Sequence, residues 1–248
     1  FLSAQRPARI ATQSVAGGVD YFIANSEVVK KRIKKFYRRD SEVIYPPVEL
    51  KRIKELKNKR IKELGGTYYY LYVGKLAVAK NVNLAIEAAG KMGFKLKIVG
   101  KGGEEERLCK LATTSPKPSP VRRGKKGEVE FLGEVRDEEL VDLYTNCKAV
   151  IFPAVDEDFG IVPVEAMSFG KPVVAYRSGG VMETVIEGKT GVFFDELTVE
   201  SLIEAVKKID NLTIKYDDCM SQAKKFSKEA FKRKIRKLVG EVTQNPQV

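Results

Sequence analysis

The sequence of 248 residues contains no histidine. This absence excludes Ser-His-Asp catalysis, Cys-His catalysis and imidazole metal sites from the chain. Cysteine is scarce as well, because Cys109, Cys147 and Cys219 are widely spaced and form no C-x-x-C pair. A disulfide framework or a zinc site is therefore not expected, and a reducing, cytoplasmic environment is the simplest expectation.

Long hydrophobic runs are also missing. The longest apolar stretches, 68–73 and 149–155, have the length of strands and fall well short of the ~18 residues of a membrane span. The chain opens with Phe1, and its first residues show no signal-peptide pattern. We expect a fragment of a longer protein, at most peripherally bound to the inner face of a membrane.

Acidic residues are fewer than basic residues: the chain has 33 Asp and Glu and 45 Lys and Arg, which gives a net charge of +12. Nucleic acid, an anionic membrane or a phosphate-bearing small molecule could explain the excess, and so could a solvated lysine-rich surface. The basic residues mix with acids at helical spacing and form no stripe interleaved with aromatics, so we expect no nucleic-acid partner. They concentrate in segments 30–39, 51–62, 117–126 and 224–237.

Hydrophobic residues make up 43% of the chain, enough for a sizeable core. Strand and helix patterns alternate nearly throughout, which predicts an α/β fold with a Rossmann-like parallel sheet and helices on both of its faces. Strands are predicted at 20–25, 42–45, 68–73, 95–99, 128–132, 148–152, 172–175 and 191–194. Helices are predicted from Ser26 and at 51–64, 81–92, 104–112, 137–146, 161–169, 181–187, 198–209, 217–226 and 228–242, with a mobile insertion at 113–127.

The segment 152–172 is the most informative part of the chain. A buried strand ends in an acidic loop, Gly160 permits a tight turn, and Pro163 suits a first helical turn. Ligands of open parallel sheets lie beyond the carboxyl ends of the strands, so this loop is expected to line a binding crevice. Free backbone N–H groups near Phe159, Gly160 and Ile161 could receive a phosphate or sugar oxygen.

Two carboxylates frame this turn. Glu157 lies in the loop and Glu165 lies eight positions later in the helix. Either could be an ordinary solvated acid, but apolar neighbours leave Glu165 on a largely buried helix, where a carboxylate needs partners.

The E-x₇-E arrangement from Glu157 to Glu165, with Gly-Gly-Val-Met-Glu at 179–183, resembles glycosyltransferase family 4. The resemblance covers about 43–194 and is closest to mannosyltransferase-like members. It implies the GT-B architecture, in which two Rossmann-like domains face a cleft, and transfer with retention of anomeric configuration without a metal. By position, it implies that Glu165 binds the nucleotide ribose and that Glu157 faces the donor sugar. The amides of Phe159, Gly160 and Ile161 would then hold sugar hydroxyls and phosphate oxygens.

A second matching segment begins at Gly74-Lys75 and includes Lys80. Family members usually carry Gly-Arg followed five residues later by Lys, and the two cations grip the donor diphosphate. Lys75 keeps the charge of that arginine but loses its planar, bidentate fork. Either lysine taken alone could be a solvated surface charge.

Three further segments have weaker signals. The resemblance places 131–140 near the nucleobase, with main-chain contacts around Val135. The Gly-rich stretch 100–103 lacks the full dinucleotide fingerprint, so it could be a phosphate loop or a tight turn. Gly179-Gly180 is open to the same two interpretations.

The resemblance also implies a domain plan. Residues 1–46 would be the tail of an N-terminal GT-B domain or a linker, 47–227 the nucleotide-sugar-binding domain, and 228–248 a C-terminal crossover helix. The acceptor pocket and any catalytic histidine would lie outside this chain.

The expected function is hexosyl transfer from a nucleoside diphosphate sugar, with GDP-mannose favoured by the subgroup. The acceptor would be lipid-linked or a polysaccharide, and no cofactor is expected. Segments 30–39 and 51–62 could contact anionic lipids. The alternatives are a non-catalytic nucleotide-sugar-binding subunit and, ranked last, a nucleic-acid-binding protein.

Overall fold

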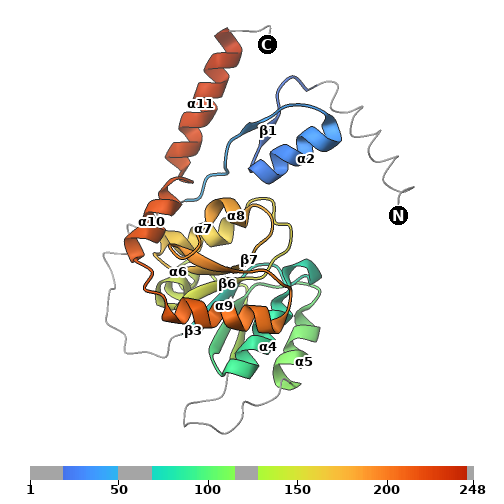
Figure 1. Ribbon diagram of the computed structural model, residues 1–248, viewed down its shortest axis with the longest axis vertical. Coiled ribbons are helices and arrows are strands. Elements are labelled where there is room, and N and C mark those ends of the chain that lie inside the picture. Colours follow the sequence, from blue (N-terminus) through green and yellow to red (C-terminus); the bar gives the residue numbers. More distant parts are fainter. Residues whose placement is uncertain (1–18, 50–68, 115–127, 245–248) are drawn as a thin grey trace, which may run out of the picture.

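The computed structural model describes residues 19–49, 69–114 and 128–244. Its centre is a six-stranded parallel sheet of order β5-β4-β3-β6-β7-β8 (Figure 1). The chain runs from β3 out to β5, returns to β6 beside β3, and continues to β8 at the opposite edge. The strands are β3 (Tyr69–Val73), β4 (Lys95–Val99), β5 (Val129–Gly133), β6 (Ala149–Phe152), β7 (Val173–Tyr176) and β8 (Gly191–Phe194).

Helices cover both faces of this sheet. One face carries α4 (Val82–Met92), α5 (Glu105–Thr114) and α9 (Val199–Asn211), whose apolar residues share a buried cluster with alternate strand residues. The other face carries α6 (Asp137–Asn146), α7 (Ile161–Ser168), α8 (Val181–Thr184) and α10 (Tyr216–Lys224). The predicted α/β class, with a parallel sheet between two helical layers, is confirmed.

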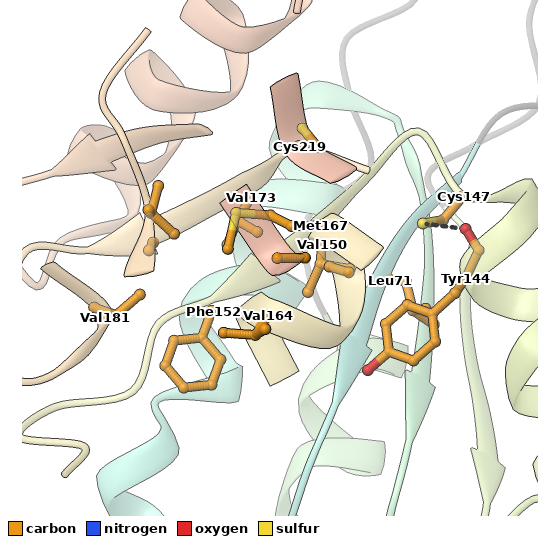
Figure 2. Packing of buried hydrophobic residues seen from close by; sticks show 14 of the residues in the cluster. Leu71, Tyr144, Cys147, Val150, Phe152, Val164, Met167, Val173, Val181 and Cys219 are labelled. Carbon is orange, nitrogen blue, oxygen red and sulfur yellow. Dashed lines mark hydrogen bonds between the residues drawn. The ribbon is translucent and has the colours of Figure 1, made fainter. Parts of the chain in front are cut away.

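Neighbouring strand residues belong to opposite clusters because side chains alternate across a sheet. Leu71 and Val150 are fully buried on the face that also holds Met167 of α7 (Figure 2). The next residues along the same strands, Tyr72 and Ile151, are buried on the other face. Burial on both faces explains why the strands are nearly continuous apolar runs.

A small N-terminal unit precedes the sheet. Strands β1 (Ile23–Ala24) and β2 (Glu42–Val43) pair in parallel and are joined by α2 (Glu27–Tyr37). Ser26 caps α2 by accepting a hydrogen bond from the N–H of Val29 at 3.1 Å. The last helix, α11 (Lys228–Gln244), extends toward this unit (Figure 1), and Lys234 donates to the carbonyl of Val43 at 3.4 Å.

Most predicted elements are present with shifted ends. The helix predicted at 181–187 is too long, since α8 ends at Thr184 and Val185 is extended. The hydroxyl of Thr190 accepts from the N–H of Ile186 at 2.8 Å, so a side chain replaces the helical partner of that amide. The strands predicted at 20–25 and 42–45 shorten to two residues each.

Some predictions lie outside the described residues. These are the helix at 51–64 and residues 115–127 of the proposed insertion. The first two residues of that insertion belong to α5, which continues to Thr114. Across the described ranges, no helix combines the length and apolar character needed to cross a bilayer.

Candidate functional site

A cavity of about 350 Å³ opens beyond the carboxyl ends of β3 and β6. Loops following these strands, the first turn of α7 and two residues of the N-terminal unit form its walls. It contains seven of the nine predicted site residues: Gly74, Lys75, Lys80, Glu157, Phe159, Gly160 and Ile161.

A second cavity, of about 470 Å³, adjoins the first along Val73, Gly74 and Lys75. Val135 lines this second cavity with Leu140. The two hollows thus share the loop after β3, and Val135 lies on the side of that loop away from Glu157.

Lys80 and Glu157 form an ion pair across the first cavity. Their side chains are 26% and 29% exposed, so the pair is shielded but reachable by a ligand. The short 3-10 helix η1 (Val78–Lys80) carries the lysine. The side-chain NH₂ of Asn81 links that turn to the Glu157 loop by donating to the carbonyl of Pro153 at 3.2 Å. An anionic ligand in the cavity could take the place of Glu157 beside Lys80.

Lys75 is exposed at the junction of the two cavities. It lines both cavities, so a ligand that bridges the two hollows could contact its charge.

The N-terminus of α7 faces the first cavity. Gly160 adopts a left-handed conformation (φ 82°) at the cap and supplies no side-chain partner to the first turn. The N–H groups of Ile161 and Val162 open the helix, and Pro163 lacks an N–H. These amides and the positive end of the helix dipole favour an anionic or hydroxyl oxygen at this point.

Glu165 lies further along α7 and lines neither cavity. Its carboxylate accepts a hydrogen bond from the hydroxyl of Tyr144 at 2.9 Å, the partner that a buried carboxylate requires. Burial raises the pKa of Glu165 above its ordinary value, and the Tyr144 hydrogen bond partly opposes this shift. Tyr144 is fixed in turn by stacking on Phe169, with ring centroids 5.1 Å apart.

The glycine segments 100–103 and 179–180 support the cavity walls through close backbone contacts. A Cβ on Gly100 (φ 126°) would lie 2.0 Å from the carbonyl oxygen of Gly74, so only glycine lets these loops meet. A Cβ on Gly180 would lie 2.3 Å from the carbonyl oxygen of Asp158, and the N–H of Gly180 donates to the carbonyl of Glu157 at 2.7 Å. Both segments therefore position the loops that carry Lys75 and Glu157.

The N-terminal unit is fastened to the site by Glu183, whose role the sequence did not predict. Its carboxylate accepts from the first amides of α2, at 2.8 Å from Glu27 and 3.1 Å from Val28. It also accepts from the hydroxyl of Tyr45 at 3.0 Å, and burial with this hydrogen bond raises the pKa of Tyr45 to about 12. A carboxylate at a helix N-terminus is stabilised by the helix dipole.

A second fastening is the ion pair between Arg32 of α2 and Asp158, which also lines the cavity. Other lining residues missed by sequence reasoning are Asn25 and Pro46. Asn25 had one available signal, since it ends a predicted strand just before a helix cap. In the described ranges, His, Cys, Asp and Glu side chains form no group of three that could hold a metal ion.

Comparison with known proteins agrees with this geometry. Residues 53–226 match the family model of glycosyl transferases group 1. The human alpha-1,3/1,6-mannosyltransferase ALG2 is 26% identical over 245 residues, covering 90% of this chain and 59% of that protein. An uncharacterized glycosyltransferase of Methanocaldococcus jannaschii is 27% identical over 211 residues, covering 85% of this chain and 55% of the relative.

Solved structures show the same fold. HepE of Anabaena, in complex with UDP and glucose, matches with a TM-score of 0.75 and 22% identity, covering 94% of this chain and 66% of that one. Sucrose-phosphate synthase of Thermosynechococcus elongatus matches with a TM-score of 0.78 and 19% identity, covering 96% of this chain and 62% of that one.

The chain spans less than two thirds of the length of each of these relatives. The family model nevertheless covers most of the chain, and the structure shares the Rossmann-like sheet of its GT-B neighbours. The chain therefore belongs to the glycosyl transferases group 1 family, in agreement with the resemblance identified from its motifs.

Proposed function

We propose that this chain is the donor-binding portion of a retaining glycosyltransferase that transfers a hexose from a nucleoside diphosphate sugar. The observation that carries the proposal is one cavity that gathers Lys75, Lys80, Glu157 and the uncapped start of α7 at the carboxyl edge of a parallel sheet. Two ammonium groups and helix-terminal amides suit a diphosphate, and a carboxylate suits sugar hydroxyls. The adjoining cavity at Val135 offers room for the nucleoside.

The chemistry follows from this placement. In glycosyl transfer, the bond between the anomeric carbon and the phosphate oxygen breaks, and its electron pair moves to the diphosphate. Lys75, Lys80 and the α7 amides would stabilise the negative charge that builds there, so their effect grows toward the transition state. The sugar is left with oxocarbenium character, and the Glu157 carboxylate lies on the cavity wall beside Lys80.

Glu165 has a separate proposed role. We assign it to the ribose hydroxyls of the nucleotide, as the motif resemblance implies. Its pairing with Tyr144 supports the assignment, because that hydrogen bond holds the carboxylate in one orientation. Because Glu165 lines neither cavity, ribose binding would also require movement of the residues that separate it from the nucleoside, after which its free lone pairs could accept from the ribose hydroxyls.

We further propose mannose as the sugar and GDP-mannose as the donor, on the similarity to ALG2 proteins named as mannosyltransferases. The HepE structure is a complex with UDP and glucose, so uridine donors are the direct competitors. A thermal-shift screen against GDP-, UDP- and ADP-sugars separates them, since a ligand at 100 times its Kd stabilises by ~2.7 kcal/mol. GDP-mannose should give the largest shift, and a larger shift with another donor would overturn this choice.

The acceptor is proposed to be lipid-linked or a polysaccharide. The basic segment 30–39 supports contact with an anionic membrane, although Lys34 pairs with Asp40 at 2.7 Å and Arg32 pairs with Asp158. Cosedimentation with anionic and neutral vesicles at low and high salt tests this, and equal binding to both would count against it. Donor binding without turnover in the complete protein would identify a non-catalytic nucleotide-sugar-binding subunit instead.

A further inference from the structure

We propose that Asn25 of the N-terminal unit contacts a hydroxyl of the transferred sugar, and so contributes to recognition of the donor from outside the Rossmann-like sheet. The inference rests on the proposed function and assigns an additional binding residue to the same cavity. Asn25 lines that cavity together with Lys80, Glu157 and Gly160.

The first observation is an unpartnered polar atom. The side-chain oxygen of Asn25 is buried and, within the described part of the chain, has no hydrogen-bond partner. Buried amide oxygens in native proteins nearly always have a partner, and leaving one without is costly. This oxygen is closed to solvent, so the side chain would have to turn toward the cavity that Asn25 lines, where a ligand would supply the missing donor.

The second observation is the position of Asn25 in the fold. It follows β1 directly and precedes Ser26, the cap of α2. Like Glu157 after β6, it therefore lies beyond the carboxyl end of a parallel strand, where α/β folds bind ligands. The cavity is thus built from the carboxyl edges of two separate sheets.

The third observation is that the structure fixes this position. The carboxylate of Glu183 accepts hydrogen bonds from the backbone N–H groups of Glu27 and Val28, two and three residues after Asn25. Arg32 pairs with Asp158 on the cavity wall. These contacts limit the movement of the Asn25 backbone relative to the Glu157 loop, so only its side chain has to turn toward a ligand.

The chemistry of the orphaned atom selects the sugar rather than the diphosphate. A carbonyl oxygen accepts hydrogen bonds, and the ionised oxygens of a diphosphate have none to donate. Sugar hydroxyls donate and accept equally well. The cations Lys75 and Lys80 and the α7 amides already provide donors for the diphosphate.

The test is calorimetric titration of the chain with GDP, GDP-mannose, UDP and UDP-glucose, without acceptor. The informative quantity is the Kd of the nucleotide divided by the Kd of its sugar conjugate. Asn25→Ala should leave nucleotide affinity unchanged and lower this ratio about tenfold, or ~1.4 kcal/mol. Asn25→Asp keeps the accepting oxygen and should restore most of the ratio. Asn211→Ala, at an exposed asparagine of α9, is the matched control and should behave as wild type.

The outcomes separate the two proposals. A wild-type chain that binds none of the four ligands would overturn the proposed function and this inference with it. Wild-type binding with an unchanged ratio in Asn25→Ala would overturn the inference alone, and so would equal losses for nucleotide and sugar conjugate. Melting curves of each variant in the absence of ligand exclude loss of folding as the cause. If the ratio is unchanged but transfer by the complete protein falls, Asn25 contacts the acceptor hydroxyl instead, and the inference is wrong.

Discussion

At the scale of single residues, the ion pair between Lys80 and Glu157 is the centre of the site. Both groups are partly shielded, and each is matched in charge by the other when no ligand is bound. In the proposed function, a diphosphate sugar would replace both halves of this contact, with phosphate beside the ammonium and hydroxyls beside the carboxylate. On that proposal, the pair keeps two opposite charges in position for the donor.

Lys80→Ala in the complete enzyme should lower kcat by about 100-fold or more, because one donor to a charge that develops in the transition state is lost. Lys80→Arg should retain more activity because it keeps the charge. Steady-state kinetics with a saturating donor measure the effect. Lys91→Ala removes a comparable but exposed ion pair on α4 and should leave kcat unchanged. A near-normal kcat in Lys80→Ala would remove Lys80 from the proposed machinery.

Glu165 predicts a pH dependence of stability. Burial raises the pKa of its carboxyl in the folded protein above the unfolded value of 4.5, so the folded state holds its proton to higher pH. This group consequently favours folding at low pH, and that contribution is lost as the pH rises from 4.5 through the raised pKa. Glu165→Gln keeps an acceptor for Tyr144 without the charge, so it should gain melting temperature over wild type at neutral pH and lose that advantage below pH 4.5. A difference that does not vary with pH would contradict the assigned burial effect.

At the scale of elements, loops that touch through glycines determine the shape of the cavity. Gly100 brings the loop after β4 against the loop that carries Lys75, and Gly180 brings the start of α8 against the loop that carries Glu157. Each contact is backbone on backbone, so it leaves no room for adjustment by side-chain rotation. Such loops hold their residues in place even though they contain no regular structure.

Gly180→Ala should destabilise the protein by ~1–3 kcal/mol, the usual cost of forcing an extra methyl group into a packed site. It should also weaken nucleotide-sugar binding, because the added carbon lies against Asp158 beside Glu157. Urea denaturation and calorimetry report the two effects. Gly240→Ala, in a position of α11 with open space around it, should be neutral or stabilising. If both variants keep wild-type stability and affinity, the close contact at Gly180 is not structurally important.

The Glu183 contact predicts local protection of α2. Glu183→Ala removes the acceptor for the backbone N–H groups of Glu27 and Val28 and for the hydroxyl of Tyr45. These N–H groups should therefore exchange with solvent about 5- to 150-fold faster, for a loss of ~1–3 kcal/mol. Hydrogen exchange measured by mass spectrometry or NMR follows them directly. Glu204→Ala, on the exposed face of α9, is the control. Unchanged exchange at α2 would show that Arg32 and the aromatic contacts are sufficient to hold the N-terminal unit.

At the scale of the whole molecule, three aromatic rings join distant parts of the chain. Tyr45 follows β2, Phe159 precedes α7 and Phe226 lies between α10 and α11, with ring centroids 5.2–5.7 Å apart. The N–H of Val48 donates to the carbonyl of Phe226 at 2.9 Å, which adds a backbone link at the same place. The N-terminal unit, the cavity wall and the start of α11 therefore share one packing centre.

Phe226→Ala should lower the free energy of unfolding by ~3–5 kcal/mol, the usual cost of deleting a buried phenyl ring. Phe226→Leu should cost less because it fills much of the space. Urea denaturation measures both, and Phe36→Ala, at an exposed ring of α2, is the control. A loss below about 1 kcal/mol for Phe226→Ala would mean that the three-ring centre contributes little to holding the parts together.

The sequence by itself determined the fold class, most elements and the family. Alternating apolar strands and amphipathic helices leave few arrangements other than a parallel sheet covered on both faces, and the E-x₇-E segment identifies the loop that lines its carboxyl edge. Seven predicted residues converge on one cavity for that reason.

Only the tertiary structure decided the rest. The pairing of Lys80 with Glu157, the fastening of α2 by Glu183 and the presence of Asn25 in the cavity all join residues far apart in the chain. The separation of Glu165 from both cavities and the shortening of α8 at Thr184 likewise depend on Tyr144 and Thr190, which local patterns do not connect with them. Hydrophobic periodicity reports which face of an element is buried, but the partners of a polar group depend on how the loops pack, and that information appears only in three dimensions.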